Sequence, residues 1–395
     1  MIIKPKIRSN FFANAHPIGC REFVKQQIDE AKAQPKFKGP KNVLIIGGSS
    51  GYGLASRIAL AYGADANTVN VSFETGPVKN RTGTAGWWNN KFFLNFAKET
   101  QNIHKDFNGD AFTKALKEDV IKYIKETLGT IDLVVYSLAS PVRINEITNE
   151  LVRSQIKTLG EPAVGQTIDI AKKVLLPLTV EPATEQEVED TVFVMGGEDW
   201  KNWMMALEQH NALSEGVKTI SYTYIGGPTT EKIYRKGTLG KAKQDLEDTA
   251  ETLNQHLASN FQGEALISSS KAVATKASVF IPQMPIYASC LYEVMIAHHQ
   301  HESILEHKYR LFKDMVYGSG RILDDAKRIR IDHKEMEHEI QHKTLDLMKN
   351  CDEKRLFSLH GTKVFLRDVY QLNGFDFDTV DYDQDVDIDA LAKQI

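Results

Sequence analysis

The sequence has few cysteines and prolines and no long hydrophobic run. Only three cysteines occur among 395 residues, and none belongs to a CxxC pair, which argues against a disulfide framework and against a cysteine-based zinc or redox site. The longest uncharged stretch, residues 277–292, contains two prolines and is too short to span a membrane. Because acidic and basic residues nearly balance, with a net charge of −4, no general attraction to nucleic acid or anionic membranes is expected.

The N-terminus and the overall composition indicate a globular protein of the cytoplasm. Basic residues at positions 4, 6 and 8 are not followed by an apolar run, so no signal peptide is expected. With 42% hydrophobic and 25% charged residues, the chain resembles ordinary soluble proteins that bury a core. We therefore expect a cytoplasmic protein whose partners include neither nucleic acid nor a membrane. We also expect a monomer, although the sequence does not determine the oligomeric state.

Short apolar strands alternate with amphipathic helices in two parts of the chain. The predicted strands span residues 42–46, 69–73, 131–136, 219–225 and 264–268. The predicted helices span residues 54–61, 110–128 and 238–260, the second opening at Asp110. Such alternation is typical of a parallel sheet with right-handed crossovers. The fold class is therefore α/β, a Rossmann-like doubly wound parallel sheet enlarged by a long insertion and C-terminal helices. The glycine motif of residues 47–53 indicates that the sheet is of the short-chain dehydrogenase kind.

No linker or internal repeat divides the chain, so we expect one elaborated domain over residues 1–395. Its core covers about residues 40–140 and 219–280, with a partly helical insertion at about 141–218 and a helical part at about 285–395. The acidic tail is interleaved with aromatic residues. Disordered acidic tails rarely carry so many aromatics, so the tail is expected to pack on the body.

A glycine-rich turn joins the first predicted strand to the first predicted helix. Gly47, Gly51 and Gly53 fit the pattern GxxxGxG, a dinucleotide fingerprint in which glycine lets backbone amides approach a pyrophosphate at a helix N-terminus. An ordinary glycine-rich turn is the alternative, since the pattern alone is weakly specific. The expected cofactor-binding residues of this turn are Gly47, Gly48, Ser49, Ser50, Gly51 and Tyr52.

The second predicted strand ends at Phe73 and Glu74, both expected beside the cofactor. Glu74 lies 21 residues after the last glycine of the fingerprint, near the place of an acid that accepts hydrogen bonds from the adenosine ribose. A carboxylate there repels a 2′-phosphate and favours NADH over NADPH, although Lys79 and Arg81 could weaken that preference. A solvated loop acid remains the alternative reading.

Two further loops are expected to line the same crevice. Ligands of doubly wound sheets bind outside the carboxyl ends of the strands. Asp110 and Ala111 would therefore lie near the adenine, and the backbone of Leu138 and Ala139 would pass close to the cofactor. Judged by residue type alone, each is better explained as a helix cap or a small packing residue, and only its position favours a role in cofactor binding.

A tyrosine and a lysine are candidates for catalysis. Tyr234 and Lys243 form a Tyr-x8-Lys pair, whereas no Tyr-x3-Lys pair follows Tyr224 or Tyr234. Nine residues of continuous helix would put the two groups on opposite sides. The pair works only if Tyr234 precedes the helix, as Gly237 and a capping Thr238 suggest. About one such pair is expected by chance in a chain of this composition, so the spacing is weak evidence.

Other motifs carry less weight. His338, Glu339 and His342 fit the HExxH pattern of zinc proteases, but the preceding run 332–337 is interpreted as a solvated, charged face, and no metal site is expected. Trp200 and Trp203 are interpreted as core residues.

Motifs spread over nearly the whole chain resemble those of the FabV-type enoyl-ACP reductases and the related trans-2-enoyl-CoA reductases. The matching segments are residues 16–20, 47–53, 83–89, 136–141, 195–200, 372–375 and 380–382, together with Tyr224, Tyr234 and Lys243. The chain departs from the expected pattern at Trp88, where tyrosine is more usual. Residues 273–275 resemble the loop that lies beside the nicotinamide in that family.

The resemblance implies an NADH-dependent reductase of the C2=C3 bond of trans-2-enoyl thioesters in fatty acid synthesis. Tyr234 would donate the proton, Lys243 would bind the cofactor and lower the tyrosine pKa, and Tyr224 would contact the thioester carbonyl. The resemblance further implies that Ala272, Val273 and Ala274 bind the cofactor and that residues 281–287 line the acyl chain. An ordinary buried helix start is an equally good interpretation of residues 281–287.

Two alternatives remain open. One is a 3-ketoacyl carbonyl reductase on the same scaffold, and the other is a protein that senses NAD(H) without turnover. The sequence decides neither between acyl carrier protein and CoA as the carrier nor the length of the acyl chain.

Overall fold

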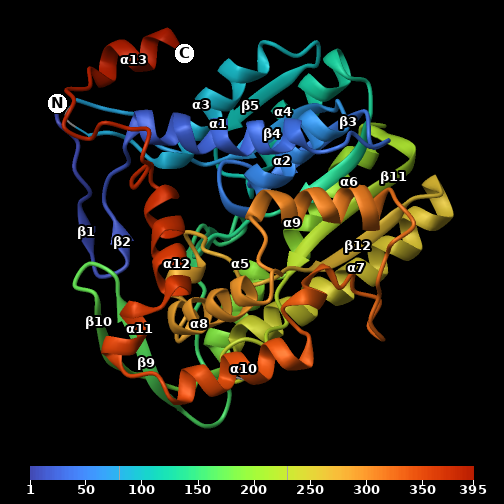
Figure 1. The fold of residues 1–395 in the computed structure, drawn as a ribbon. Coiled ribbons are helices and arrows are strands. Elements are labelled where there is room, and N and C mark those ends of the chain that lie inside the picture. The colour runs from blue at the N-terminus through green and yellow to red at the C-terminus, as the bar shows by residue number, and fades with distance from the viewer. Residues whose placement is uncertain (80, 229) are drawn as a thin grey trace.

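A six-stranded parallel sheet forms the centre of the molecule. The computed structural model describes residues 1–79, 81–228 and 230–395 (Figure 1). The strands, in spatial order, are β12 (Glu264–Ser269), β11 (Leu213–Thr223), β6 (Ile131–Tyr136), β3 (Asn42–Ile46), β4 (Asn67–Ser72) and β5 (His104–Asn108). All neighbouring pairs are parallel. The strand order reverses between β3 and β6, as in doubly wound sheets, so a ligand crevice is expected beyond the carboxyl ends of these two strands.

Helices cover both faces of this sheet. One face packs against α2 (Gly51–Gly63), α3 (Ala85–Ala97) and α9 (Ile304–Arg310), and α1 (Pro17–Ala33) packs against these three helices. The other face packs against α4 (Lys114–Thr127), α6 (Glu198–Gln209) and α7 (Thr238–Phe261). The β3 side chains alternate between these two clusters, which explains why the strand is a continuous apolar run. The predicted α/β fold with a doubly wound parallel sheet is thus confirmed.

A third cluster packs against the residues that follow β11 and β12. It contains α8 (Met284–Ala297), α10 (His338–Lys349), α11 (Glu353–Ser358) and α12 (His360–Gln371), with the short 3₁₀-helix η1 (Ser278–Phe280). The hairpin of β9 (Ala163–Asp169) and β10 (Val174–Val180) lies at its edge (Figure 1). The remaining elements are β1 (Ile7–Arg8), β2 (Phe11–Phe12), β7 (Val142–Ile144), β8 (Leu151–Arg153), α5 (Glu185–Met195), the π-helix η2 (Leu311–Val316), the 3₁₀-helix η3 (Ile331–Lys334) and α13 (Ile388–Gln394).

Several predicted boundaries are wrong. The second predicted helix does not open at Asp110: α4 begins at Lys114 with Thr113 as its N-cap, and the Asp110 side chain instead accepts a hydrogen bond from the Phe112 amide at 3.0 Å. β11 begins at Leu213 and ends at Thr223, so Tyr224 lies beyond the strand. The insertion holds two hairpins besides α5 and α6, and β5 and α3 lie outside the predicted elements.

The acidic tail packs on the body, as predicted. Phe375, Phe377 and Val386 are buried, and the two chain ends meet through an ion pair of 2.5 Å between Lys4 and Asp383 (Figure 1). Trp200 is buried in the core, as expected. Within the described part of the chain, no helix is both long and apolar enough to cross a membrane.

Candidate active site

The glycine turn between β3 and α2 has the geometry of an anion cradle. Gly47 has φ +92°, and a Cβ atom there would lie 2.4 Å from the Ser137 carbonyl oxygen, so only glycine fits. A Cβ on Gly53 would lie 2.1 Å from the Gly47 oxygen. Among the described residues, no side chain at the N-cap Ser50 caps α2. The first amides of α2 are therefore available for a pyrophosphate, and the turn fits a dinucleotide.

Glu74 lies against this turn, where the sequence places it. Its Oε1 accepts a hydrogen bond of 2.6 Å from the Ser49 hydroxyl, and its backbone amide donates to Asn108 Oδ1 at 2.7 Å. A Cβ on Gly86 would fall 2.0 Å from Glu74 Oε1, so the carboxylate lies over the first turn of α3. Phe73 is 78% exposed beside it. The acid is thus fixed from two sides at the end of β4.

The loops after β5 and β6 are held at the same edge of the sheet. The backbone of Ser137 and Leu138 lies against Gly47. The Ala111 carbonyl accepts hydrogen bonds from Lys117 Nζ at 2.9 Å and Trp203 Nε1 at 3.1 Å. Lys117 forms a buried ion pair of 2.7 Å with Asp199. The segment 195–200 matched the family only as a motif. The structure shows that it supports the loop of Asp110 and Ala111, because its Asp199 pairs with Lys117.

The loop after β12 crosses the start of α2. The Tyr52 hydroxyl donates to the Lys271 carbonyl at 2.5 Å. The Thr275 side chain comes within 3.5 Å of the place that a Cβ on Gly51 would take. Ala272, Val273 and Ala274 are buried between these two contacts. The structure thus brings this loop together with the glycine turn, although the two are more than 200 residues apart in sequence.

Tyr234 lies before α7 and Lys243 lies inside it, which is the arrangement that the spacing required. The N-cap is Gly237, and Thr238 is not the cap: its hydroxyl donates to the Gln155 carbonyl at 2.5 Å. The Tyr224 and Tyr234 rings meet edge to face with centroids 4.6 Å apart. Lys243 Nζ donates to the Tyr222 carbonyl at 3.1 Å, near the end of β11.

Burial shifts the protonation of these three groups. It raises the pKa of Tyr234 far above its usual value, with a further contribution from Glu335, and it raises the pKa of Tyr224 in the same way. The expectation that Lys243 lowers the pKa of Tyr234 is therefore wrong for the protein alone, because burial has the larger effect. Burial lowers the pKa of Lys243 to about 8, against an opposing effect of Glu247. The tyrosines therefore remain protonated and can donate hydrogen bonds, whereas the lysine loses its charge above about pH 8.

Glu335 joins the site, and the sequence did not reveal it. The side chain is fully buried. Its Oε1 accepts hydrogen bonds from the Tyr224 hydroxyl at 3.0 Å and the Tyr287 hydroxyl at 2.7 Å, and its Oε2 accepts from the Ala272 amide at 2.6 Å. Burial raises the pKa of this carboxyl to about 7 despite these donors.

The interpretation of residues 332–337 as a solvated face is wrong for two of them. Asp332 and Glu335 are both buried, and Asp332 accepts hydrogen bonds from the Ser269 hydroxyl at 2.8 Å and from Arg330. Charged residues are rarely buried unless they are paired. Here most of the partners lie dozens of residues away in sequence, so no local signal could reveal the pairing.

The HExxH residues lie on the outer surface of α10. His338, Glu339 and His342 are exposed, and the Glu339 carboxylate pairs with Lys343 at 2.7 Å. Among the residues that the structure describes, no group of three or more histidine, cysteine, aspartate or glutamate side chains is arranged to hold a metal ion.

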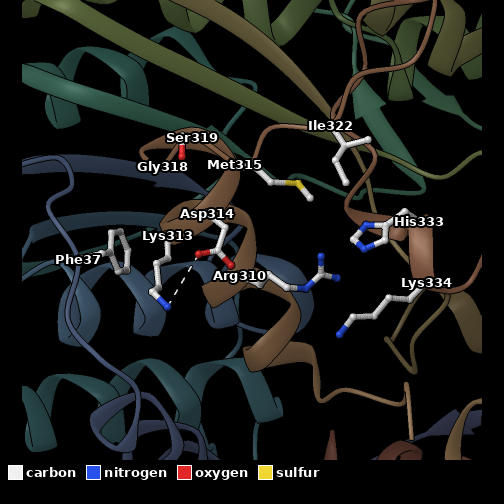
Figure 2. Close-up of a pocket in the computed structure, with 11 residues that line it drawn as sticks. Phe37, Arg310, Lys313, Asp314, Met315, Gly318, Ser319, Ile322, His333 and Lys334 are labelled. Carbon is white, nitrogen blue, oxygen red and sulfur yellow. Dashed lines mark ion pairs between the residues drawn. The ribbon is translucent and has the colours of Figure 1, made fainter. Parts of the chain in front are cut away.

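A pocket of about 680 Å³ opens elsewhere, beside η2 and η3 (Figure 2). Its lining includes none of the site residues predicted from the sequence. Arg310 and Lys334, which reach it from opposite sides, both pair with the Glu302 carboxylate, at 2.7 and 3.0 Å. Lys313 pairs with Asp314 at 3.9 Å. The cations of this pocket are thus largely neutralised within the protein.

Three family models match consecutive parts of the chain. Residues 2–79 match the NAD(P)H binding domain of trans-2-enoyl-CoA reductase, and residues 81–317 match the trans-2-enoyl-CoA reductase catalytic region. Residues 323–386 match a model described as an enoyl reductase FAD binding domain. The first part contains the glycine turn and Glu74, and the second contains Tyr224, Tyr234 and Lys243.

The third segment does not fit a flavin. It contains two glycines, Gly361 and Gly374. A Cβ on Gly361 would lie 2.1 Å from the Glu293 amide nitrogen of α8, and one on Gly374 would lie 2.3 Å from the His16 carbonyl oxygen. Both glycines thus serve close packing inside the protein. The segment, which the structure describes throughout, has no glycine turn between a strand and a helix to receive a diphosphate.

Relatives match over the full length. The chain is 44% identical to the trans-2-enoyl-CoA reductase [NADH] of Clostridium beijerinckii, covering 100% of this chain and 99% of the relative. It is also 44% identical to enoyl-[acyl-carrier-protein] reductase [NADH] 2 of Photobacterium profundum, covering 100% of both. The solved trans-2-enoyl-CoA reductase of Clostridium acetobutylicum in complex with NADH superposes with a TM-score of 0.97 at 44% identity, covering 100% of this chain and 99% of that one. The chain belongs to the trans-2-enoyl-CoA reductase family.

Proposed function

We propose that the protein reduces the C2=C3 bond of trans-2-enoyl thioesters to saturated acyl thioesters with NADH as the reductant. The observation that carries this proposal is the contact between the rings of Tyr234, which is buried, and Tyr224, which is partly buried. Lys243 donates to the Tyr222 carbonyl two residues before Tyr224, at the end of the sheet where the loops after the strands converge. The relatives named as NADH-dependent reductases of enoyl-CoA or enoyl-acyl-carrier-protein support it. The substrate is therefore a thioester, carried either on CoA or on acyl carrier protein.

The residues at the ends of β3, β4, β5 and β6 would hold the cofactor. The glycine turn, Gly47 to Tyr52, would bind the pyrophosphate through backbone amides, and Glu74 would accept hydrogen bonds from the ribose hydroxyls. Asp110 and Ala111 would contact the adenine. Leu138 and Ala139 on one side and the loop 272–274 on the other would enclose the nicotinamide end. Bound NADH supplies the hydride that C3 of the substrate receives.

Tyr234, Lys243 and Tyr224 would complete the reaction. Hydride addition to C3 leaves an enolate, and the Tyr234 hydroxyl would stabilise its oxygen and then donate the proton. The high pKa of the buried tyrosine keeps this hydroxyl protonated until the enolate forms. Lys243, charged at neutral pH, would hold the ribose and compensate the negative charge. Tyr224 would hydrogen-bond the thioester carbonyl, and the largely buried segment 281–287 would surround the acyl chain.

The test is an assay of NADH oxidation with crotonyl-CoA and, separately, with acetoacetyl-CoA. We expect turnover of crotonyl-CoA only, because the site is suited to an enolate rather than to carbonyl reduction by a Tyr-x3-Lys pair. Reduction of acetoacetyl-CoA alone would favour the 3-ketoacyl reductase alternative. Tight NADH binding with turnover of neither substrate would favour the NAD(H)-sensing alternative.

A further inference from the structure

One tyrosine of the pair, Tyr224, donates a hydrogen bond to a carboxyl group for which the proposed mechanism has no use. Glu335 Oε1 lies between two hydroxyl groups, those of Tyr224 and Tyr287, while Oε2 is occupied by the Ala272 amide. The Tyr287 oxygen in turn accepts a hydrogen bond of 2.8 Å from Gln341 Nε2. The same side-chain nitrogen, Gln341 Nε2, also donates to the backbone carbonyl of Glu335 at 2.9 Å, which fixes the orientation of the Gln341 side chain. Every contact of the carboxyl group is thus defined.

The protonation of this carboxyl group determines the direction of one hydrogen bond. An ionised carboxylate only accepts, so both tyrosine hydroxyls must point their single hydrogen at Oε1. Tyr224 then has no hydrogen for a substrate carbonyl, which is itself an acceptor. A protonated carboxyl group donates one hydrogen from this position. Because the Tyr287 oxygen already accepts from Gln341, the Tyr224 oxygen is the better acceptor, and its own hydrogen becomes free.

We propose that Glu335 is a positioning residue whose protonated form turns the Tyr224 hydroxyl towards the substrate carbonyl and whose ionised form withdraws it. The inference rests on the proposed function, because it assumes that Tyr224 contacts the thioester. No proton is transferred to the substrate from Glu335. The carboxyl group only decides whether Tyr224 can donate, so the reaction requires the protonated form.

The surroundings keep the Glu335 carboxyl group about half ionised at neutral pH. Burial has the largest effect and raises its pKa, and the carboxylate of Asp332 on η3 raises it further. The hydrogen bonds from Tyr287, Ala272 and Tyr224 lower it. The net result is a pKa of about 7. The other titratable groups that interact electrostatically with Glu335 are Lys271 after β12, Arg330 before η3, Tyr52 on α2 and Tyr234 before α7.

The test is the pH dependence of kcat with crotonyl-CoA in the wild type and in Glu335→Gln. A glutamine has the same shape, can accept from the Ala272 amide and can donate its NH₂ to the tyrosine oxygens at every pH. We expect wild-type kcat to fall as the pH rises through about 7. In Glu335→Gln, kcat should stay within about threefold of the wild-type value at low pH and lose this decline. Only the decline near pH 8 that belongs to Lys243 should remain.

A matched control is Glu337→Gln, the same substitution at an exposed carboxylate two residues further on, whose partner is Gln300. This variant should keep the wild-type decline. If Glu335→Gln also keeps the decline near pH 7, or if it folds and binds NADH but loses kcat at every pH, the proposal is wrong.

A second variant covers the case in which Glu335→Gln does not fold. Tyr287→Phe removes one donor from the carboxylate and should move the decline upward by about one pH unit. An unchanged decline in a folded Tyr287→Phe protein would refute the proposal.

A readout without turnover separates this inference from the proposed function. Infrared difference spectra of the NADH complex should show a protonated carboxyl band that titrates near pH 7 and is missing in Glu335→Gln. If the wild type does not reduce crotonyl-CoA, the proposed function fails whatever the spectra show. If it does, and the band does not titrate there, only the inference fails.

Discussion

The substitutions Tyr234→Phe and Tyr224→Phe separate the roles of the two tyrosines, because the hydroxyl groups have different partners. Among the residues that the structure describes, the Tyr234 hydroxyl donates no hydrogen bond, so its loss leaves no partner unsatisfied. The Tyr224 hydroxyl donates to the buried Glu335 carboxyl group, which would be left with one donor fewer. The two losses should therefore differ in their effect on stability as well as on catalysis.

The expected magnitudes follow from these contacts. Tyr234→Phe should change the free energy of unfolding by less than about 0.5 kcal/mol. Its kcat should fall about 10²- to 10³-fold, or roughly 3–4 kcal/mol, which is typical for the loss of one group that stabilises an oxyanion. Tyr224→Phe should cost about 1–3 kcal/mol of stability through the weakened hydrogen bonding of a buried carboxyl group. Its loss of kcat should be smaller, because in the proposed mechanism Tyr224 orients the substrate and Tyr234 supplies the proton.

The assays are steady-state turnover of crotonyl-CoA and chemical denaturation of both variants and the wild type. Binding of NADH, followed by fluorescence, shows whether each variant retains the cofactor site. A Tyr234→Phe protein with nearly wild-type kcat, beside a Tyr224→Phe protein that has lost it, would reverse the assigned roles.

Five further predictions concern the cofactor, stability, domain structure and oligomeric state. Glu74→Ala should narrow the preference for NADH by removing the repulsion of a 2′-phosphate, measured as the ratio of kcat/KM for NADH and NADPH; an unchanged ratio would exclude this role. Lys243→Met should lower kcat and raise KM for NADH about tenfold or more, because a hydrogen bond from a charged group is worth about 1.5–3 kcal/mol. An effect on kcat alone would show that the lysine does not bind the cofactor. The pKa of Glu335 rises on folding from 4.5 to about 7, so the folded state binds this proton more tightly. The free energy of unfolding should thus fall by up to about 3 kcal/mol as the pH rises through this window, a loss that denaturation of Glu335→Gln should not show. Limited proteolysis should release no stable fragment of residues 1–150 if the chain forms one cooperative unit, and light scattering should report a monomer.

The parts of the fold that the sequence predicts are those whose burial leaves a local pattern. β3 and β6 are buried on both faces and are therefore apolar runs, apart from Asn42 and Asp132 near their starts. β5, with the sequence His-Lys-Asp-Phe-Asn, is an edge strand and has no such pattern. The hairpin of β9 and β10 is partly exposed and mostly irregular in its alternation, so the insertion could only be described as partly helical.

The residues of the candidate site likewise differ in whether a local sequence pattern marks them. The glycine turn is a local motif, and a strand before it and a helix after it are visible in the sequence. Tyr234 and Lys243 are separated by a short segment whose glycine and threonine indicate a helix start. Glu335 has no such context, because its contacts come from residues 48, 63 and 111 positions away. A buried charge whose partners are all distant in sequence resembles a surface charge until the chain is folded.

The motifs that carry the family resemblance also have different physical roles, and their spacing does not distinguish these roles. His16 caps α1 by accepting a hydrogen bond from the Gly19 amide at 3.2 Å, and its own amide donates to the Asn373 carbonyl at 2.9 Å. A Cβ on Gly19 would lie only 1.6 Å from the Gly374 carbonyl oxygen. Two motifs at opposite ends of the chain therefore form one contact between backbones, which any larger side chain would separate. The glycines of the motifs at 16–20 and 372–375 therefore serve close packing, whereas the motifs at 47–53 and 224–243 contain the residues that we propose for cofactor binding and catalysis.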